Sequence, residues 1–248
     1  MSRRSPATIK RILRYWLQRP PTVKTDLSKI KSLICDGTWL KPNNEVYVVM
    51  NAADHTVIAG AYDLCERSHR LTPFYAQLAS RGLDPYSATT DGDPRQMNYL
   101  RAAWPAITLQ RCIVHVQRQG LNWCRQYPKR LEAKRLRELF LALSEVKSQD
   151  AEVQLLRQAY TWEERFGPGI TKSLNQGRVF TDLLLARRSL LKALPNLFHF
   201  LQDRRIPNST NALEGYFARL KEKYRRHRGM DLKNRQAFFQ WYFFLQPK

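Results

Sequence analysis

The sequence predicts an α/β protein: a mixed β-sheet flanked by helices, followed by a long helical stretch. Segments rich in β-branched and aromatic residues alternate with segments of helical periodicity between residues 32 and 110. From about residue 117 to 205 only helical spacing remains. The alternating order of three strands, helix, strand, helix and strand is typical of a mixed sheet covered by helices.

A basic amphipathic helix is expected over residues 6–18. Ser5 can cap it, and Pro6 suits its first position. One face carries apolar residues at helical spacing, namely Ile9, Ile12, Leu13, Trp16 and Leu17. Pro20 and Pro21 end the helix and begin a linker.

The sheet is expected to contain five strands. They are predicted at Ser32–Asp36, Glu45–Met50, Val57–Asp63, Tyr86–Asp91 and Ile107–Gln110. Helices are expected over residues 70–81 and from Pro94 onwards. In the helical stretch, Gly167-Pro168-Gly169 predicts a break. A helix with an apolar stripe through Leu213 and Tyr224 follows, and the aromatic residues 238–244 are expected to form a core helix.

The composition favours a nucleic-acid partner. The chain has 248 residues, enough for one large domain or two small ones, with 42 Lys+Arg against 21 Asp+Glu, a formal charge of +21 and a pI of about 10.2. Neutralising phosphates releases counterions, so a polyanion fits this charge, with an anionic membrane surface as the rival partner. There is no run of about 20 apolar residues and no apolar signal-peptide core at the start.

The cysteines and the charge distribution add two expectations. The cysteines at positions 35, 65, 112 and 124 show no secreted-scaffold spacing, so a reducing cytoplasm is expected. Residues 36–100 are net acidic, with eight acidic and five basic residues, within a strongly basic chain. An acidic island surrounded by basic sequence fits a cation site bordered by a phosphate-binding surface. Ordinary exposed carboxylates are the alternative interpretation.

Two aspartates in this island are candidate metal ligands. Asp36 follows an apolar run, where a buried, unpaired carboxylate is costly, but Asp36-Gly37 is also a common turn signal, and the residue alone favours the turn. Asp91 ends a predicted strand, and sites in open α/β sheets lie beyond strand ends. A turn before a helix explains Asp91 equally well.

Glu214 is the third candidate ligand. Asn211 and Glu214 have the spacing of a capping box, so Glu214 can complement the helix dipole. The first turn of a helix can also present a carboxylate to a metal, so both interpretations are compatible. Magnesium prefers carboxylate and phosphate oxygens.

Cys112-Ile113-Val114-His115 is ambiguous by itself. Zinc needs four ligands, and only Cys124 lies nearby with suitable chemistry. A small buried thiol beside a hydrogen-bonded histidine is the favoured interpretation, and contact of His115 with a phosphate or base is a third.

A basic run follows Glu214 and predicts contact with phosphates. Only Glu222 interrupts it, whereas a solvated helix face usually alternates charge signs. Tyr224 lies among these basic residues, so its ring is expected to stack to some extent on nucleic-acid bases. The predicted DNA-binding residues are Arg219, Lys221, Lys223, Arg225, Arg226 and Arg228.

The order of these signals resembles the DDE transposases of the mutator-like bacterial insertion-sequence group. The resemblance covers residues 32–245, and its most telling stretches are Cys35-Asp36-Gly37-Thr38, Thr90-Asp91-Gly92, Cys112-x-x-His115 and Thr210-Asn211-x-x-Glu214. It implies an RNase H-like catalytic core interrupted by a helical insertion. It also implies that Asp36, Asp91 and Glu214 are catalytic and bind two Mg²⁺ or Mn²⁺ ions, with Cys112, His115 and Asn211 shaping the site.

The resemblance also implies an activity and a domain plan. Metal-dependent cleavage at a transposon end is followed by attack of the freed 3′-hydroxyl on target DNA, in a homo-oligomer bound to DNA. Residues 1–31 are interpreted as a basic helix and linker, the remnant of a DNA-recognition module in a truncated or late-started copy. The remaining parts are the first part of the core at 32–116, the insertion at 117–205 and the last part of the core at 206–248. The rivals are a nuclease without strand transfer and a transposase-derived DNA-binding protein without catalysis.

Overall fold

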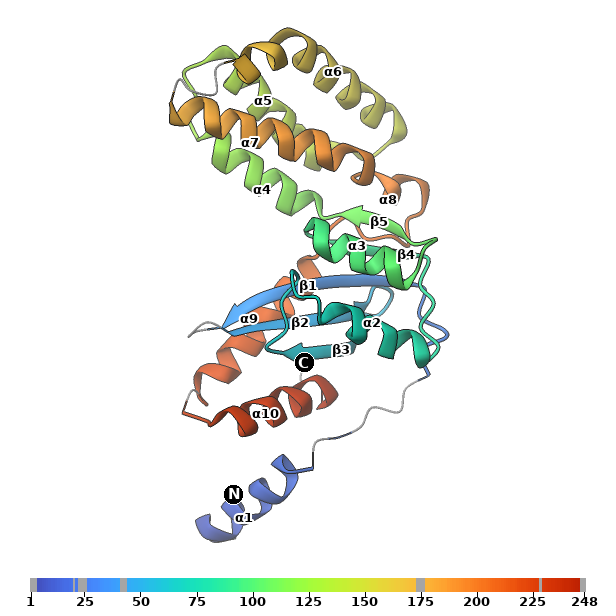
Figure 1. The fold of residues 1–248 in the computed structure, drawn as a ribbon, viewed down its shortest axis with the longest axis vertical. Helices are drawn as coiled ribbons and strands as arrows, with labels where there is room; N and C mark the ends of the chain where they lie inside the picture. Colours follow the sequence, from blue (N-terminus) through green and yellow to red (C-terminus); the bar gives the residue numbers. More distant parts are fainter. Residues whose placement is uncertain are drawn as a thin grey trace. The chain divides into compact units, whose positions relative to one another are not determined.

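The computed structural model describes residues 4–19, 21, 26–40, 44–172, 177–227 and 229–245. These residues form an α/β fold with five strands, both antiparallel and parallel pairing, and helices around the strands (Figure 1). The chain divides into two compact units. Unit 1 comprises Met1–Tyr86, Pro94–Ile107 and Asn211–Lys248, and unit 2 comprises Ser87–Asp93 and Thr108–Thr210.

Unit 1 is built on three antiparallel strands in the order β3-β2-β1. These strands are β1 (Ser32–Leu40), β2 (Asn44–Asn51) and β3 (Val57–Tyr62). β1 pairs with β2 from Leu33 opposite Asn51 to Leu40 opposite Asn44. The predicted hairpin is confirmed, but the first strand continues four residues beyond its expected end at Asp36, because β2 supplies a partner along the whole length.

Two C-terminal helices cover one face of these strands. They are α9 (Asn211–Arg225) and α10 (Leu232–Leu245), which pack against β1 and β3 respectively (Figure 1). Ile34 and Val48 from the sheet join Leu213 and Phe239 from the helices in one buried cluster. The expectation of an aromatic core helix is therefore confirmed. Gly60 on β3 allows the close approach, because a Cβ there would overlap the ring of Phe243.

The opposite face holds a buried polar cluster. Here the chain adds α2 (Leu71–Ser80) and α3 (Pro94–Ala103), both in predicted positions. The hydroxyls of Tyr47 and Tyr75 lie 2.5 Å apart, and Gln96 donates to Tyr47 at 2.7 Å. Burial raises the pKa of Cys35, which shares this face, to about 12. The side-chain alternation of β1 therefore directs Cys35 and Asp36 to different faces.

The predicted N-terminal helix is confirmed as α1 (Pro6–Leu17). Ser5 caps it by accepting the Thr8 N–H at 3.3 Å. It contacts α10 through an edge-to-face pair of Trp16 with Trp241, whose indole N–H also donates to the Trp16 carbonyl at 3.1 Å.

Unit 2 combines two parallel strands with a helical segment. β4 (Ser87–Thr90) and β5 (Thr108–Arg111) pair in register from Ser87 opposite Thr108 to Thr90 opposite Arg111. The helices are α4 (Ile113–Cys124), α5 (Leu131–Ala142), α6 (Gln149–Lys172), α7 (Arg178–Ala193) and α8 (His199–Gln202), with short 3₁₀ turns η1 (Leu143–Glu145) and η2 (Leu194–Asn196). The predicted helical character of this stretch is confirmed.

The predicted break at Gly167-Pro168-Gly169 is wrong, because α6 continues through it. Proline removes one helical N–H donor, but packing compensates for the loss. Gly167 is buried, and a Cβ there would overlap the carboxylate of Glu163, which forms a two-point ion pair with Arg187 on α7. The Thr171 hydroxyl donates to the Gly167 carbonyl at 3.1 Å.

Candidate metal-binding carboxylates and their surroundings

Asp36 lies inside β1 and is only 6% exposed. It sits opposite Val48 and shares a sheet face with Ile34, the face on which α9 packs. The Asp-Gly turn interpretation is therefore wrong, because the strand passes straight through Asp36 and Gly37. A carboxylate in this position is costly unless hydrogen bonds or a cation compensate for its burial.

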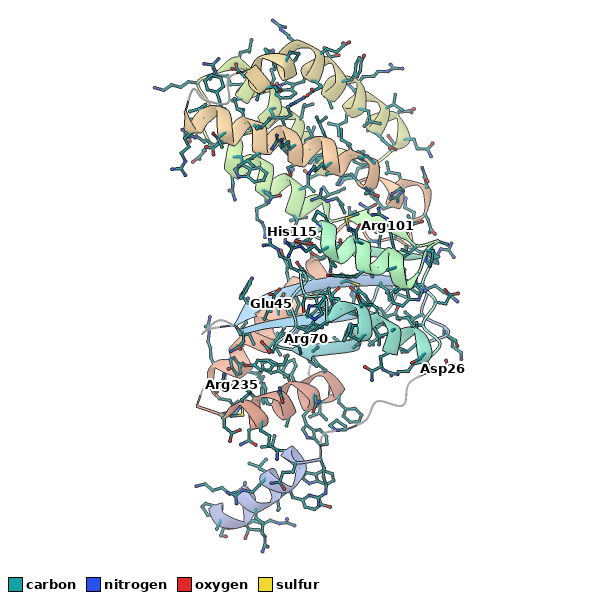
Figure 2. All side chains as sticks on the ribbon, in the orientation of Figure 1. Asp26, Glu45, Arg70, Arg101, His115 and Arg235 are labelled. Carbon is teal, nitrogen blue, oxygen red and sulfur yellow. The ribbon has the colours of Figure 1, made fainter. Side chains whose placement is uncertain are left out.

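The backbone N–H of Gly37 is shared by two carboxylates. It donates to Asp36 Oδ1 at 2.8 Å and to Glu66 Oε1 at 2.7 Å. A Cβ at Gly37 would stand 2.8 Å from Glu45 Oε1 and 3.2 Å from Glu66 Cγ, so the glycine makes room for two glutamates (Figure 2 labels Glu45). Sequence reasoning missed Glu66, since it lies in a charged loop with no periodicity or motif.

Glu214 lies in the first turn of α9 and is partly exposed. Its neighbour Leu213 is fully buried in the cluster that contains Ile34. Unit 1 therefore carries Asp36 on β1 and Glu214 on the helix that packs against β1. Because α9 begins at Asn211, Thr210 holds the position before the helix and Glu214 is the fourth helical residue. The predicted capping box of Asn211 and Glu214 is therefore wrong, since it needs the glutamate at the third helical position.

Asp91 directly follows the end of β4 in unit 2. Its carboxylate accepts the Asp93 N–H at 2.9 Å, and the Gly92 N–H donates to Thr90 Oγ1 at 3.0 Å. The expected turn before α3 is thus present, and it leaves Asp91 at the carboxyl end of a parallel strand. The turn is therefore confirmed, and the role of Asp91 as a metal ligand stays a prediction.

A second residue that the sequence analysis missed is Arg111. Its guanidinium donates to the Asp91 carbonyl at 3.2 Å, and its Nε is buried without a hydrogen-bond partner. Burial lowers the pKa of Arg111, while the negative charge of Asp91 acts in the opposite direction. Gly92 has φ +90°, and a Cβ there would overlap the guanidinium. The glycine is therefore required both by its backbone conformation and by this close approach.

Cys112 and His115 belong to one cluster at the end of β5. Cys112 precedes α4, and His115 projects from its first turn (Figure 2). The Cys112 sulfur accepts the Thr210 N–H at 3.3 Å, and the Thr210 hydroxyl lies 3.4 Å from His115 Nδ1. Burial acts to raise the pKa of Cys112, but hydrogen bonding and charge from His115, with the Thr210 N–H, outweigh it and lower the pKa. The favoured interpretation of a small buried thiol with a hydrogen-bonded histidine is confirmed.

Zinc binding by Cys112, His115 and Cys124 is not supported. Cys124 ends the 12-residue helix α4, so it lies roughly 17 Å along the axis from the helix start. Within the part of the chain that the structure describes, no group of three or more His, Cys, Asp or Glu side chains is arranged to hold a metal ion.

The proposed ligands are therefore divided between the units. Asp36 and Glu214 belong to unit 1, as does Asn211, which is exposed at the start of α9, while Asp91, Cys112 and His115 belong to unit 2. The convergence of all three carboxylates stays a prediction.

The basic run of α9 is largely exposed. Arg219, Lys223, Arg225 and Arg226 are exposed, Lys221 is partly exposed, and Arg228 lies outside the described residues. Arg226 pairs with Glu222 at 2.9 Å. The stacking role expected for Tyr224 is wrong. Its ring is 3% exposed and packs against Phe238 and Phe239, because the apolar stripe of α9 requires a large residue there.

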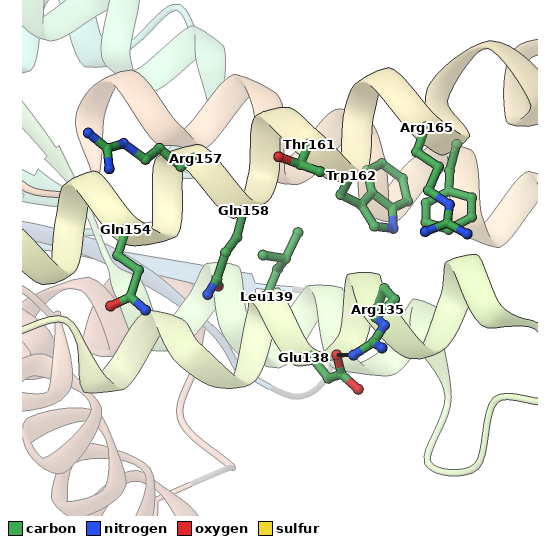
Figure 3. A pocket seen from close by; sticks show the side chains of 10 residues that line it. Arg135, Glu138, Leu139, Gln154, Arg157, Gln158, Thr161, Trp162 and Arg165 are labelled. Atoms are coloured by element: carbon green, nitrogen blue, oxygen red, sulfur yellow. Dashed lines mark hydrogen bonds and ion pairs between the residues drawn. The ribbon is translucent and has the colours of Figure 1, made fainter.

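A second cationic surface borders a groove between α5 and α6. Its volume is about 460 Å³. Gln154 and Gln158 point from α6 towards α5, and Arg135 is joined to Glu138 at 2.8 Å (Figure 3). Arg157 and Arg165 are further lining residues. The groove thus combines cationic and amide side chains with the carboxylate of Glu138 and apolar residues such as Trp162.

Comparisons with known proteins give no family assignment. No protein-family model matches the chain, and a search of curated proteins finds no match. None of the helices in the described ranges is long and apolar enough to cross a membrane.

Proposed function

We propose that the chain is a DNA transposase of the DDE type, similar to the mutator-like bacterial insertion-sequence group, with an RNase H-like core. Asp36, Asp91 and Glu214 are the proposed catalytic residues. The observation that supports this most is the aspartate buried within β1, together with a glutamate in the first turn of the helix that packs on that strand.

The donor set fits a hard divalent cation. Carboxylate oxygens are the side-chain ligands that Mg²⁺ prefers, and Mn²⁺ accepts the same donors. Asp36, Asp91 and Glu214 would hold two such ions. When bound, the ions would supply Lewis-acid stabilisation of the attacking and leaving oxygens of a phosphodiester displacement.

The other proposed roles belong to this chain's own side chains. The basic residues of α9 bind DNA phosphates, and the arginines of the α5–α6 groove offer a second surface that can contact phosphates. The contacts of Cys112 and His115 with Thr210 fix the segment that leads into α9, four residues before Glu214. Asn211 begins that helix. Two copies, each bound to one DNA end, form the proposed oligomer.

A test uses supercoiled plasmid DNA with Mg²⁺ or Mn²⁺, scoring nicked and joined products separately. We expect both products from the parent chain, and neither from Asp36→Asn, Asp91→Asn or Glu214→Gln. DNA binding by these variants should persist, because the basic surface is unchanged. Calcium should support binding more than turnover. Nicking without joining would favour the nuclease alternative.

A DNA-binding protein without catalysis is the second candidate. It is favoured by the exposed basic residues of α9, which can bind phosphates without any metal. Equal DNA processing by the parent and by the three carboxylate variants would overturn the catalytic assignment. DNA binding with no processing by any variant, the parent included, would favour this second candidate.

A further inference from the structure

The Gly37 N–H is the point where the Asp36 carboxylate is fixed, and it has a second acceptor. Asp36 Oδ1 and Glu66 Oε1 both accept this one donor, at 2.8 Å and 2.7 Å. The buried carboxylate of Asp36 and the carboxylate of Glu66 therefore meet at a single backbone N–H. Glu66 reaches this strand from the segment between β3 and α2.

A carboxylate that ligates a cation directs its oxygens to that cation. Turning the Asp36 carboxylate towards a cation takes Oδ1 away from the Gly37 N–H. If Asp36 were the sole acceptor, ligation would leave a partly buried N–H without a partner, and this cost would weaken cation binding. Glu66 removes the conflict, because its oxygen already accepts the same N–H.

We propose that Glu66 is a positioning residue for Asp36: it accepts the Gly37 N–H, so that Asp36 Oδ1 can leave this donor for a divalent cation without leaving the N–H unpaired. This inference rests on the function proposed above. Glu66 acts through the strand backbone and is not itself assigned as a ligand. Residues that orient metal ligands in this way typically contribute about 10- to 100-fold to metal affinity or activity.

Gly37 is part of the same arrangement. A Cβ at this position would press on Glu66 Cγ at 3.2 Å and on Glu45 Oε1 at 2.8 Å. Any larger residue would therefore displace the Glu66 side chain from the N–H that it occupies. The positioning role thus explains why a glycine follows Asp36 within a strand, where glycine is otherwise unfavourable.

The test compares Glu66→Ala with Glu66→Gln in the full chain. The measured quantities are the Mn²⁺ concentration at half-maximal plasmid nicking, the dissociation constant for DNA and the unfolding midpoint. Glu66→Ala should raise the half-maximal Mn²⁺ concentration about 10-fold or more with DNA affinity unchanged. Glu66→Gln keeps an acceptor oxygen and should restore the parent value.

Asp63→Asn is the matched control, because Asp63 is an exposed carboxylate on the same segment, 3.6 Å from Arg70. It should leave the Mn²⁺ requirement unchanged. A lower unfolding midpoint for Glu66→Ala with an unchanged Mn²⁺ requirement would overturn the inference. Equal loss in the alanine and glutamine variants would overturn it too, since charge would then matter and not the hydrogen bond. Unchanged nicking by Asp36→Asn would instead overturn the proposed function.

Discussion

The two Asp-Gly pairs of this chain have the same local sequence and opposite surroundings. Asp36-Gly37 lies inside β1, and its glycine admits the carboxylates of Glu45 and Glu66. Asp91-Gly92 follows the end of β4, and its glycine has φ +90° and admits the guanidinium of Arg111. One aspartate thus shares its backbone donor with a second carboxylate, and the other lies next to a guanidinium.

The difference shows that the same dipeptide can be held by its surroundings in two ways. At Asp36, a second carboxylate, that of Glu66, accepts the same backbone N–H. At Asp91, the guanidinium of Arg111 donates to the backbone carbonyl, and the turn holds the carboxylate against the Asp93 N–H. The glycine is needed for space at the first pair, and for both space and backbone conformation at the second.

Among the variants that test this comparison, Gly92→Ala should cause the largest loss in the free energy of unfolding. The substitution forces a left-handed conformation on alanine and drives its Cβ into Arg111. We expect a loss of about 3 kcal/mol in the free energy of unfolding, measured by urea titration. Gly215→Ala is the control, because Gly215 is helical and a Cβ there meets no atom closer than 3.9 Å. That variant should be stabilised by about 0.5–1 kcal/mol.

Arg111→Leu tests whether the guanidinium holds the Asp91 turn. It removes the hydrogen bond to the Asp91 carbonyl and the positive charge next to the carboxylate. We expect a loss of about 2 kcal/mol in the free energy of unfolding, as is typical of hydrogen bonds to charged groups. Plasmid nicking should fall as well. A stability equal to that of the parent would contradict the positioning role of Arg111.

The pH dependence of stability should distinguish Cys112, at the end of β5, from Cys35, the buried thiol of unit 1. The folded-state pKa of Cys112 lies below its ordinary value of about 9, so Cys112 contributes stability above that value and loses it as pH falls through the folded pKa. Stability should therefore rise with pH towards about 9, and Cys112→Ser should remove this part of the slope. The pKa of Cys35 is raised instead, so Cys35→Ser should not remove it. Urea midpoints between about pH 6 and about pH 9 measure both.

Gly37→Ala should have the smallest effect on stability. Its Cβ meets the flexible ends of two glutamate side chains, which can move aside, so we expect a change below about 1 kcal/mol. It should nevertheless raise the Mn²⁺ requirement for nicking, as Glu66→Ala does. A large loss of stability combined with an unchanged Mn²⁺ requirement would mean that Gly37 serves only the packing of β1.

Local periodicity determined where the helices and strands lie. The β-branched and aromatic residues of Glu45–Met50, the helical spacing from about residue 117 to 205 and the Ser5-Pro6 start signal were sufficient, because these patterns depend on neighbours in sequence. The position of Asp91 after a strand and the placement of Glu214 in the first turn of α9 followed from the same signals. The sequence also specified the basic face of α9.

Only the tertiary structure decided what distant residues bring to each position. By itself Asp36-Gly37 indicates a turn, but pairing with β2 makes it part of a strand. Gly167-Pro168-Gly169 indicates a break, but α6 continues through it and packs against α7. Tyr224 among lysines and arginines is buried because α10 covers it. Glu66 and Arg111 acquire their roles from contacts with Gly37 and Asp91, 29 and 20 residues away in the chain. Such contacts leave no local periodicity, so no sequence pattern could predict them.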